Sequence, residues 1–165
     1  MAGPIAEKRF SVLCEIARAQ HFSWREAVAE LCPGREAEVV RRMWEITGRK
    51  TAEAYLKRID RERPLPLQVA ESVVWSSQCM GEDARVELRD GDPSAYVRHA
   101  DCPWFHWHRR LSLLGEDRPG CDSWFSTLVG EINRALGTAL RVETLGSLPD
   151  GDGACVRRFW MEGDA

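Results

Sequence analysis

The sequence predicts an α+β fold, in which N-terminal helices pack with a four-stranded antiparallel sheet made of two hairpins and with two further helices. Apolar residues recur at helical spacing through much of residues 4–79. Apolar and polar residues then alternate in two regions, 83–100 and 140–161, and each region is divided by a turn rich in Gly, Pro and Asp. Helices and hairpins occur in runs, without the strand–helix–strand alternation of a parallel sheet, which favours the antiparallel arrangement.

Residues 1–80 form the helical part, and residues 81–165 the αβ part, of one predicted domain that covers 1–165. Five helices are expected in the helical part, over 4–20, 23–31, 35–47, 51–61 and 67–79. A capping box that begins at Ser23 starts the second of them. Gly48 fits the C-terminus of the third.

The αβ part contains both hairpins and two helices between them. The strands are expected over 83–89, 94–100, 140–147 and 154–161. Asp101 is expected to cap a helix in which Cys102 is the first residue and a proline follows. A second helix is expected to begin at Gly120, with Cys121 in its first turn, and to run through Leu136.

Length, charge and hydropathy limit the classes of function. A chain of 165 residues can bury a core without disulfides or a metal ion. Its net charge of −3 does not indicate a positively charged surface, so nucleic acid is not an expected partner. No apolar stretch reaches the roughly 20 residues that span a bilayer. Residues 1–10 lack a signal-peptide core. We therefore expect a cytoplasmic protein with no membrane partner.

The six cysteines contain no CxxC pair and are expected to be mostly reduced in the cytoplasm. Three of them, Cys102, Cys121 and Cys155, lie where regular structure is expected to begin. We predict that these three cysteines meet in space. The first two fall in the first turns of predicted helices, where the positive end of the helix lowers the pKa of a thiol.

Cys102 and His106 are four residues apart, so their side chains lie on one side of the predicted helix. The pair suits a nucleophile with its general base, or two ligands of one metal ion. The alternative is a cysteine that only packs at the helix start, with His106 in an ordinary hydrogen bond. Cys155 shares a strand face with Arg157, and Glu143 on the partner strand is either a ligand or a solvated residue.

Tryptophans follow two of these cysteines in the sequence. Their rings are expected either to fill the core or to line a pocket for a small ring compound, because ligand pockets are largely aromatic with a few polar groups. The candidate substrate-binding residues are Trp104, Trp107, Trp124 and Arg157.

Several short motifs in the second half together resemble a known family. They are Asp101-Cys102-Pro103-Trp104, Cys121 with Trp124 and Glu131, Val142-Glu143, Gly151-Asp152, and Cys155 followed by Arg157 and Phe159. With the stretch 44–56, this pattern resembles the L-2-amino-thiazoline-4-carboxylate hydrolase-like family over about residues 10–161. The resemblance implies a hydrolase that acts on a carbon–nitrogen or carbon–sulfur bond of a small heterocycle. It also implies that helices back an antiparallel sheet.

The C-terminal part is similar to the vinyl-4-reductase ligand-binding domain, found in phenol-responsive transcription activators and in tetrapyrrole biosynthesis. The shared feature is a glycine four residues before a cysteine, here Gly151 and Cys155. In phenol-sensing members, three cysteines and a glutamate hold a zinc ion. Cys121 and Cys155 match two of those cysteines, whereas Ser147 stands at the third position and Thr144 at that of the glutamate.

The first functional hypothesis is a hydrolase-like enzyme with a centre formed by Cys102, Cys121 and Cys155. Cys102 acts as nucleophile with His106 as base, or the three thiolates hold a zinc ion that activates water. Glu143 or His106 completes the zinc site in the second case. Among the possible forms of this centre, we rank a zinc site first, a metal-free centre second and an iron–sulfur cluster third.

The second hypothesis is a module that binds a small aromatic or tetrapyrrole-like molecule and uses zinc structurally. Structural zinc sites fill all four positions with protein ligands, whereas catalytic sites leave one open. A third hypothesis is an interaction protein with no such site. The expected partners are a small molecule and a second copy of the chain in a homodimer.

Overall fold

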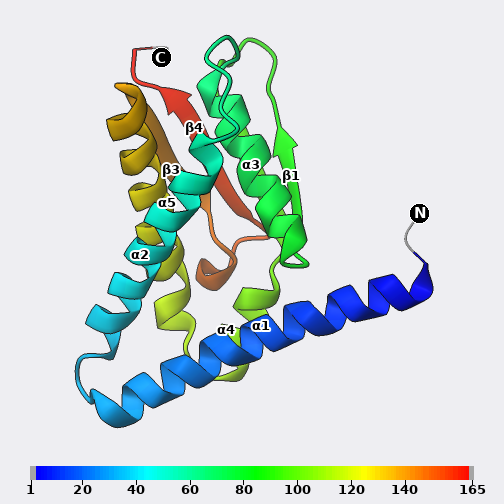
Figure 1. Cartoon of the computed structure of the whole chain (residues 1–165), viewed down its shortest axis with the longest axis vertical. Helices are drawn as coiled ribbons and strands as arrows, with labels where there is room; N and C mark the ends of the chain where they lie inside the picture. Colours follow the sequence, from blue (N-terminus) through cyan, green and yellow to red (C-terminus); the bar gives the residue numbers. More distant parts are fainter. Residues whose placement is uncertain (1–2, 164–165) are drawn as a thin grey trace. The chain divides into compact units, whose positions relative to one another are not determined.

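The structure is a computed structural model that describes residues 3–163. Its elements are α1 (Pro4–Leu31), α2 (Glu36–Leu56), α3 (Leu65–Cys79), β1 (Asp83–Glu87), β2 (Ala95–Asp101), α4 (Pro103–Arg110), α5 (Leu114–Leu136), β3 (Leu140–Gly146), the 3-10 helix η1 (Leu148–Asp150) and β4 (Cys155–Met161) (Figure 1). These elements confirm the predicted α+β class. Within residues 3–163, none of the helices combines the length and the apolar character needed to cross a membrane.

The chain divides into two compact units, of which the first ends at Val40 and the second begins at Arg41. This boundary lies inside α2 rather than near residue 80, where the helical part was predicted to end. The single domain expected over residues 1–165 stays a prediction.

The helix α1 is longer than predicted. It runs without interruption from Pro4 to Leu31, so the predicted helix start at Ser23 is wrong. Neither Gly nor Pro occurs between residues 5 and 31, and a capping-box pattern alone does not break a helix whose backbone hydrogen bonds continue on both sides. The helix ends before Pro33-Gly34, where Gly34 has a φ of 82°.

The helix α2 is also continuous. It passes through Gly48, which was predicted to end a helix, and stops at Leu56. A Cβ built on Gly48 would lie 2.8 Å from the carbonyl oxygen of Trp124 in α5. The glycine is therefore needed for the close approach of two helices and not for a C-cap.

The helix α3 confirms the prediction for residues 67–79. Pro64 precedes it and Pro66 lies in its first turn, where the missing N–H costs no helical hydrogen bond. Val69 and Val73 recur at helical spacing and are fully buried.

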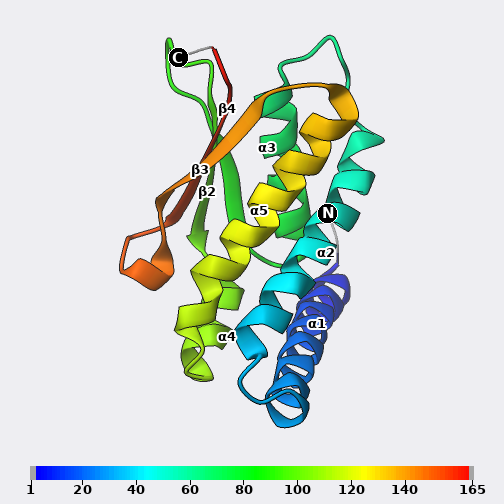
Figure 2. The ribbon, with the colours of Figure 1, turned by 90° about the vertical axis from the view of Figure 1, so that its left-hand side faces the viewer.

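The four strands form one antiparallel sheet in the order β1-β2-β4-β3. Each predicted hairpin is present, and β2 pairs with β4 to join them, with His99 opposite Cys155 and Val97 opposite Arg157. In the second unit, α3, α5 and the rest of α2 lie on one side of the sheet (Figure 2).

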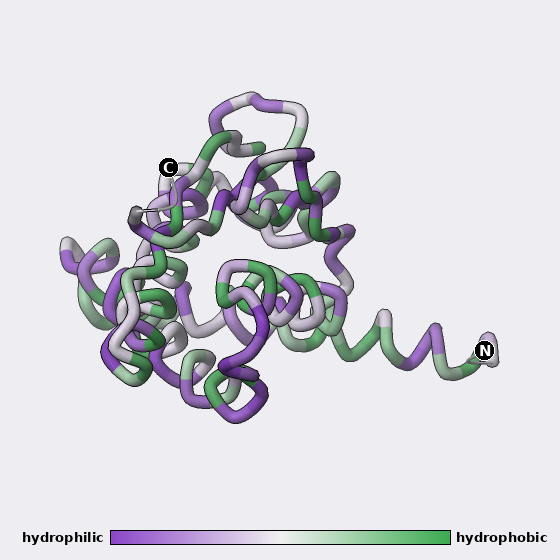
Figure 3. Tube along the Cα trace, turned by 90° about the horizontal axis from the view of Figure 1, so that it is seen from above, coloured by the Kyte–Doolittle hydropathy of each residue, from purple (hydrophilic) through white to green (hydrophobic). Residues whose placement is uncertain are grey.

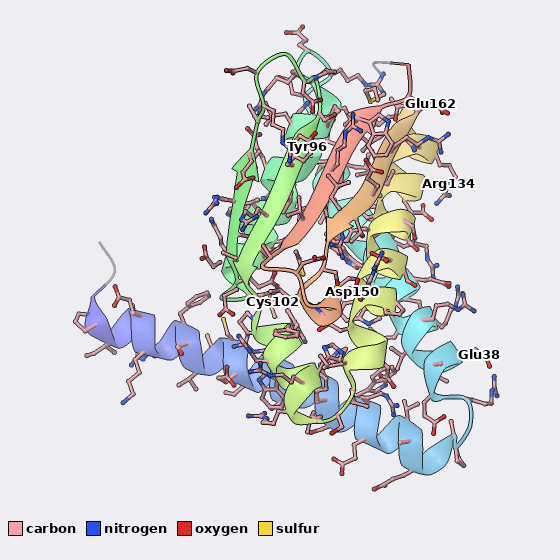
Figure 4. All side chains as sticks on the ribbon, turned by 180° about the vertical axis from the view of Figure 1, so that it is seen from behind. Glu38, Tyr96, Cys102, Arg134, Asp150 and Glu162 are labelled. Carbon is pink, nitrogen blue, oxygen red and sulfur yellow. The ribbon has the colours of Figure 1, made fainter. Side chains whose placement is uncertain are left out.

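The face of the sheet toward these helices forms the core. Val97, Leu140 and Phe159 are fully buried there and pack with Leu128 and Ile132 of α5. Figure 4 shows the opposite face, which no described helix of the second unit covers. Because side chains alternate along a strand, the strand register decides which residues can reach the interior beside the helices.

The helix α4 begins one residue later than predicted. Cys102, and not Asp101, is its N-cap residue, and the helix runs from Pro103 to Arg110. The side chain of Cys102 makes no capping hydrogen bond. Figure 4 places Cys102 at the point where β2 passes into α4.

The helix α5 begins at Leu114, well before the predicted start at Gly120, and contains Pro119. Asp117 and a neighbouring glutamate lie in its first turn, where acidic side chains favour a helix start. Cys121 therefore lies about two turns inside the helix rather than at its positive end.

Candidate functional site

Cys102, Cys121 and Cys155 come from three different elements and influence one another electrostatically, and they are here called the thiol cluster. Cys102 occupies the N-cap position of α4, Cys121 lies within α5 and Cys155 begins β4. Negative charge on Cys155 raises the pKa of Cys102, and charge on either of these two raises the pKa of Cys121. The three sulfur atoms are therefore electrostatic neighbours.

All three thiols favour the protonated form. Burial raises the pKa of Cys102, and the charges of Glu82 and Asp117 raise it further. Burial and Asp117 hold the pKa of Cys121 well above its usual value. Burial also raises the pKa of Cys155, although the N–H of Leu148 donates to its sulfur at 3.3 Å and opposes the shift.

The prediction that helix N-termini lower these pKa values is wrong. The N–H of Phe105 does favour the thiolate of Cys102, but desolvation is the larger effect. Cys121 does not lie at a helix start at all. At neutral pH the thiol cluster is a group of neutral, weakly nucleophilic thiols.

His106 has partners other than Cys102. Its Nε2–H donates to Oδ1 of Asp101 at 2.6 Å, and Arg109 donates to its Nδ1 at 3.4 Å. The His106 side chain is 45% exposed. The groups that act on the Cys102 thiol are Glu82, Asp117, Cys155 and the N–H of Phe105, and not His106. The structure therefore does not support His106 as a base for a Cys102 nucleophile.

A buried histidine–aspartate pair lies next to the cluster. The side chains of His108 and Asp117 are both 6% exposed, and His108 Nδ1 lies 3.1 Å from Asp117 Oδ2. His108 Nδ1 also lies 3.0 Å from the carbonyl oxygen of Trp104, which can only accept, so this nitrogen carries the proton. Asp117 Oδ1 accepts a weak hydrogen bond from the thiol of Cys121 at 3.9 Å.

Sequence reasoning missed this pair. It began the helix at Gly120, after Asp117, and named neither residue as a site residue. Asp117 and Cys121 are four residues apart, and this spacing would have signalled their contact once α5 was extended to Leu114.

A second polar group contains Glu82, which also acts on the thiol of Cys102. Glu82 Oε2 lies 3.1 Å from Nε2 of His99, to which Ser77 is also bonded at 3.0 Å. Trp104 donates its indole N–H to Oε1 of Glu82 at 3.0 Å. Trp104, a predicted substrate-binding residue, thus positions a carboxylate beside the cluster.

Arg157 brings a positive charge into the interior and is only 3% exposed. Its Nη1 donates to the carbonyl oxygen of Gly146 and its Nη2 to Oδ1 of Asp122, both at 3.3 Å. Thr144 donates to the same Asp122 oxygen at 2.7 Å. The Arg157 guanidinium lies 5.2 Å from the ring centroid of Phe125 and lowers the pKa of Cys121 and Cys155.

Two buried polar atoms of the second unit, Ser147 Oγ and Arg157 Nε, have no hydrogen-bond partner among the described residues. Asp117 Oδ2 also makes no hydrogen bond, but it is held by the ion pair with His108 at 3.1 Å. Ser147 and Arg157 are 1% and 3% exposed. Arg157 acts on the cluster thiols, and Ser147 directly precedes Leu148, whose N–H bonds Cys155. These two atoms therefore belong to the surroundings of the thiol cluster.

The remaining predicted site residues have other partners. Glu143 lies opposite Arg158 in the sheet and accepts from it at 3.4 Å, on the face away from Cys155. The Trp107 ring stacks with Arg110, whose guanidinium carbon lies 3.8 Å from its centroid. Trp124 donates to Thr51 in α2 at 3.4 Å. Glu143 and Trp124 therefore have hydrogen-bond partners outside the thiol cluster.

The cluster as it stands does not fit a metal ion. Across residues 3–163, no group of three His, Cys, Asp or Glu side chains is arranged to hold one. Zinc and an iron–sulfur cluster on Cys102, Cys121 and Cys155 stay predictions.

Known proteins match this chain in structure alone. No protein-family profile and no curated protein matches it. A trafficking protein particle complex subunit 3 from Naegleria fowleri, covalently bound to palmitic acid, has a TM-score of 0.56 and 11% identity, over 92% of this chain and 96% of that one. The phenol-responsive sensory domain of the transcription activator PoxR, with phenol, has a TM-score of 0.51 and 15% identity, over 86% of this chain and 73% of that one.

An H-NOX protein from S. oneidensis in the Fe(II)NO state is more distant, with a TM-score of 0.47 and 13% identity over 86% of this chain and 74% of that one. At these identities the first two comparisons, with TM-scores above 0.5, establish a shared fold. The expectation that helices back an antiparallel sheet is confirmed.

Proposed function

We propose that this chain is a small-molecule-binding module whose ligand sits at the thiol cluster. The observation that carries the proposal is the pair of buried atoms without a hydrogen bond, Ser147 Oγ and Arg157 Nε, near Asp117 Oδ2, whose contact is the ion pair with His108. Each buried polar atom without a partner costs about 1–3 kcal/mol. A bound molecule that supplies the missing hydrogen bonds would recover part of that cost.

The chemistry around the cluster favours a small molecule with one hydroxyl or amide group on an apolar body. Arg157 Nε is a donor, Asp117 Oδ2 is an acceptor and the Ser147 hydroxyl is both. Protonated thiols and the ring of Phe125 are apolar neighbours for the rest of the ligand. A phenol-like compound combines these properties.

Two proteins of the same fold provide support at the level of ligand class. One of them was solved with phenol and the other with covalently bound palmitic acid. Because a shared fold does not transfer a function, these two molecules serve here as the first compounds to test.

Isothermal titration calorimetry of the full chain with phenol, and separately with palmitate, tests the proposal. We expect saturable phenol binding that weakens about 5- to 10-fold in Ser147→Ala, which removes one hydrogen-bonding group. Ser126→Ala, at an exposed position of the same unit, is the matched control and should bind as the wild type does.

Three results would count against the proposal. The first is that neither phenol nor palmitate binds. The second is that phenol binds Ser147→Ala as tightly as it binds the wild type. The third is that the chain hydrolyses a thiazoline substrate and that Cys102→Ser abolishes this activity. The last result would favour the hydrolase hypothesis, with the carbon–nitrogen or carbon–sulfur bond as its target.

A further inference from the structure

The N-terminal half of α1 carries an exposed apolar stripe. Ile5, Val12 and Ile16 recur at spacings of seven and four residues, which places them on one side of the helix, and each is about half exposed or more. Leu13 flanks them and is 63% exposed. Figure 3 shows apolar and polar segments alternating along α1 toward the N-terminus.

This stripe is separate from the buried side of the same helix. The buried residues of α1 are Cys14, Arg18, Phe22, Arg25 and Val28. At about 100° per residue, they lie on the side of the helix opposite the stripe. The stripe is therefore a second apolar surface, of the kind that marks an interaction site in soluble proteins.

Charged residues beside the stripe indicate what binds to it. Lys8 and Glu15 are seven residues apart, so they lie on the same flank of the stripe, and Glu15 also pairs with Arg18 of its own helix at 2.6 Å. In an antiparallel pair of helices, residues on the same flank of the two chains meet, whereas in a parallel pair opposite flanks meet. A second α1 that runs antiparallel, with Ile5 against its Ile16, places Lys8 about 3 Å along the axis from its Glu15, where a second cation can approach the Glu15 carboxylate.

We propose that two copies of this chain associate through an antiparallel pairing of their α1 helices over residues 5–16. Because the pair is two-fold symmetric, the Lys8–Glu15 contact occurs twice, and Val12 is buried near the two-fold axis. Arg9 also falls in the stripe, where its aliphatic stem packs and its guanidinium stays in water. This association is independent of the ligand proposed for the thiol cluster.

The same stripe is less suited to a lipid surface. Between residues 4 and 20, the positive residues are Lys8, Arg9 and Arg18, and the negative ones are Glu7 and Glu15. Helices that bind membranes from the surface usually carry many more Lys and Arg residues on the polar face. The near-balance of opposite charges fits a second protein chain better.

Sedimentation velocity of the full chain over a range of concentrations tests the pairing. We expect a concentration-dependent dimer, and we expect Val12→Glu to weaken it about 100-fold or more, because the substitution places a charge at the axis of both copies. Leu88→Glu, at an exposed apolar position of the second unit, is the matched control and should leave the dimer intact.

Charge reversal tests the orientation. Lys8→Glu and Glu15→Lys should each weaken the homodimer about 10-fold, because each creates two repulsive contacts. A mixture of the two variants should restore association, because every Lys8–Glu15 position then again joins opposite charges. Lys57→Glu, exposed and outside α1, controls for the change in net charge.

A monomer at all concentrations would overturn the proposal. So would a dimer that is unaffected by Val12→Glu, or single charge reversals that leave the dimer unchanged. Flotation of a monomeric chain with phosphatidylcholine vesicles, lost in Val12→Glu, would assign the stripe to a membrane surface instead. Circular dichroism of each variant verifies that the helices are retained.

Discussion

The indole of Trp44 occupies the space that a side chain at position 120 would need. A Cβ built on Gly120 would lie 2.6 Å from Nε1 of Trp44 and 2.8 Å from its Cδ1. Gly48 of α2 is covered in the same way by the backbone of Trp124 in α5. Each helix thus supplies a glycine at the point where the other comes closest, and the two contacts fix the distance between α2 and α5.

Alanine at these two glycines is expected to destabilise the protein. Gly48→Ala should cost about 1–3 kcal/mol, because the new methyl group meets a backbone oxygen that cannot rotate away. Gly120→Ala should cost less, since the ring of Trp44 can shift. Gly130→Ala, where a Cβ meets nothing within 4 Å, is the control and should be neutral or stabilising by up to about 1 kcal/mol. Urea unfolding measures all three, and equal effects would contradict the close approach.

Stability is expected to fall at alkaline pH. The pKa values of Cys102, Cys121 and Cys155 are raised in the folded chain, so these thiols keep their protons after the unfolded chain begins to lose them near pH 8.5. The contribution is complete below that pH and declines above it, by about 1.4 kcal/mol per pH unit for each thiol that stays protonated. Burial also raises the pKa of Tyr55 to about 12, which adds to the decline at higher pH.

Unfolding free energies measured from pH 7 to pH 10 test this expectation. Cys121→Ala should reduce the slope, whereas Cys79→Ser, at an exposed position, serves as the control. A flat profile in the wild type would contradict the raised pKa values.

Alkylation should separate the cysteines by rate. At neutral pH, iodoacetamide is expected to modify the exposed Cys79 more than about 10-fold faster than Cys102 or Cys121, whose buried thiols have few thiolates. Mass spectrometry of timed samples identifies each site, and urea should equalise the rates. Rapid modification of Cys102 in the folded chain would instead support its role as a nucleophile.

Metal analysis tests the zinc prediction directly. Because the cluster thiols are not arranged as ligands among the described residues, protein purified without chelator is expected to contain less than stoichiometric zinc and no iron–sulfur absorption. One zinc ion per chain, lost in Cys121→Ser and retained in Cys79→Ser, would show that the thiols rearrange to bind metal.

The sequence predicted elements well where the signals are local. The turns at residues 90–93 and 149–153 located both hairpins, because Gly, Pro and Asp determine turn conformation within a few residues. The errors at Gly48 and Gly120 have one common cause. A glycine required by a neighbouring helix has the same appearance in a sequence as one at a helix boundary, whether a start, as predicted for Gly120, or an end, as predicted for Gly48. Only the position of Trp44 or Trp124 distinguishes them.

The thiol cluster was predictable in position but not in protonation. The placement of Cys102 and Cys155 follows from the elements in which they lie. Their pKa values depend on burial and on Glu82 and Asp117, which come from other segments of the chain. Likewise, the partner of His106 is its near neighbour Asp101, and the helical spacing from Cys102 gave no indication of it.

The pairing of β2 with β4 has a consequence for how the chain folds. Each hairpin can close over a short turn, whereas the central pairing, with Ala95 opposite Phe159, encloses both α4 and α5. Closing so long a loop costs entropy before the new contacts contribute, so this step is expected to limit the folding rate. During synthesis on the ribosome, the middle of the sheet therefore stays incomplete until β4 has emerged.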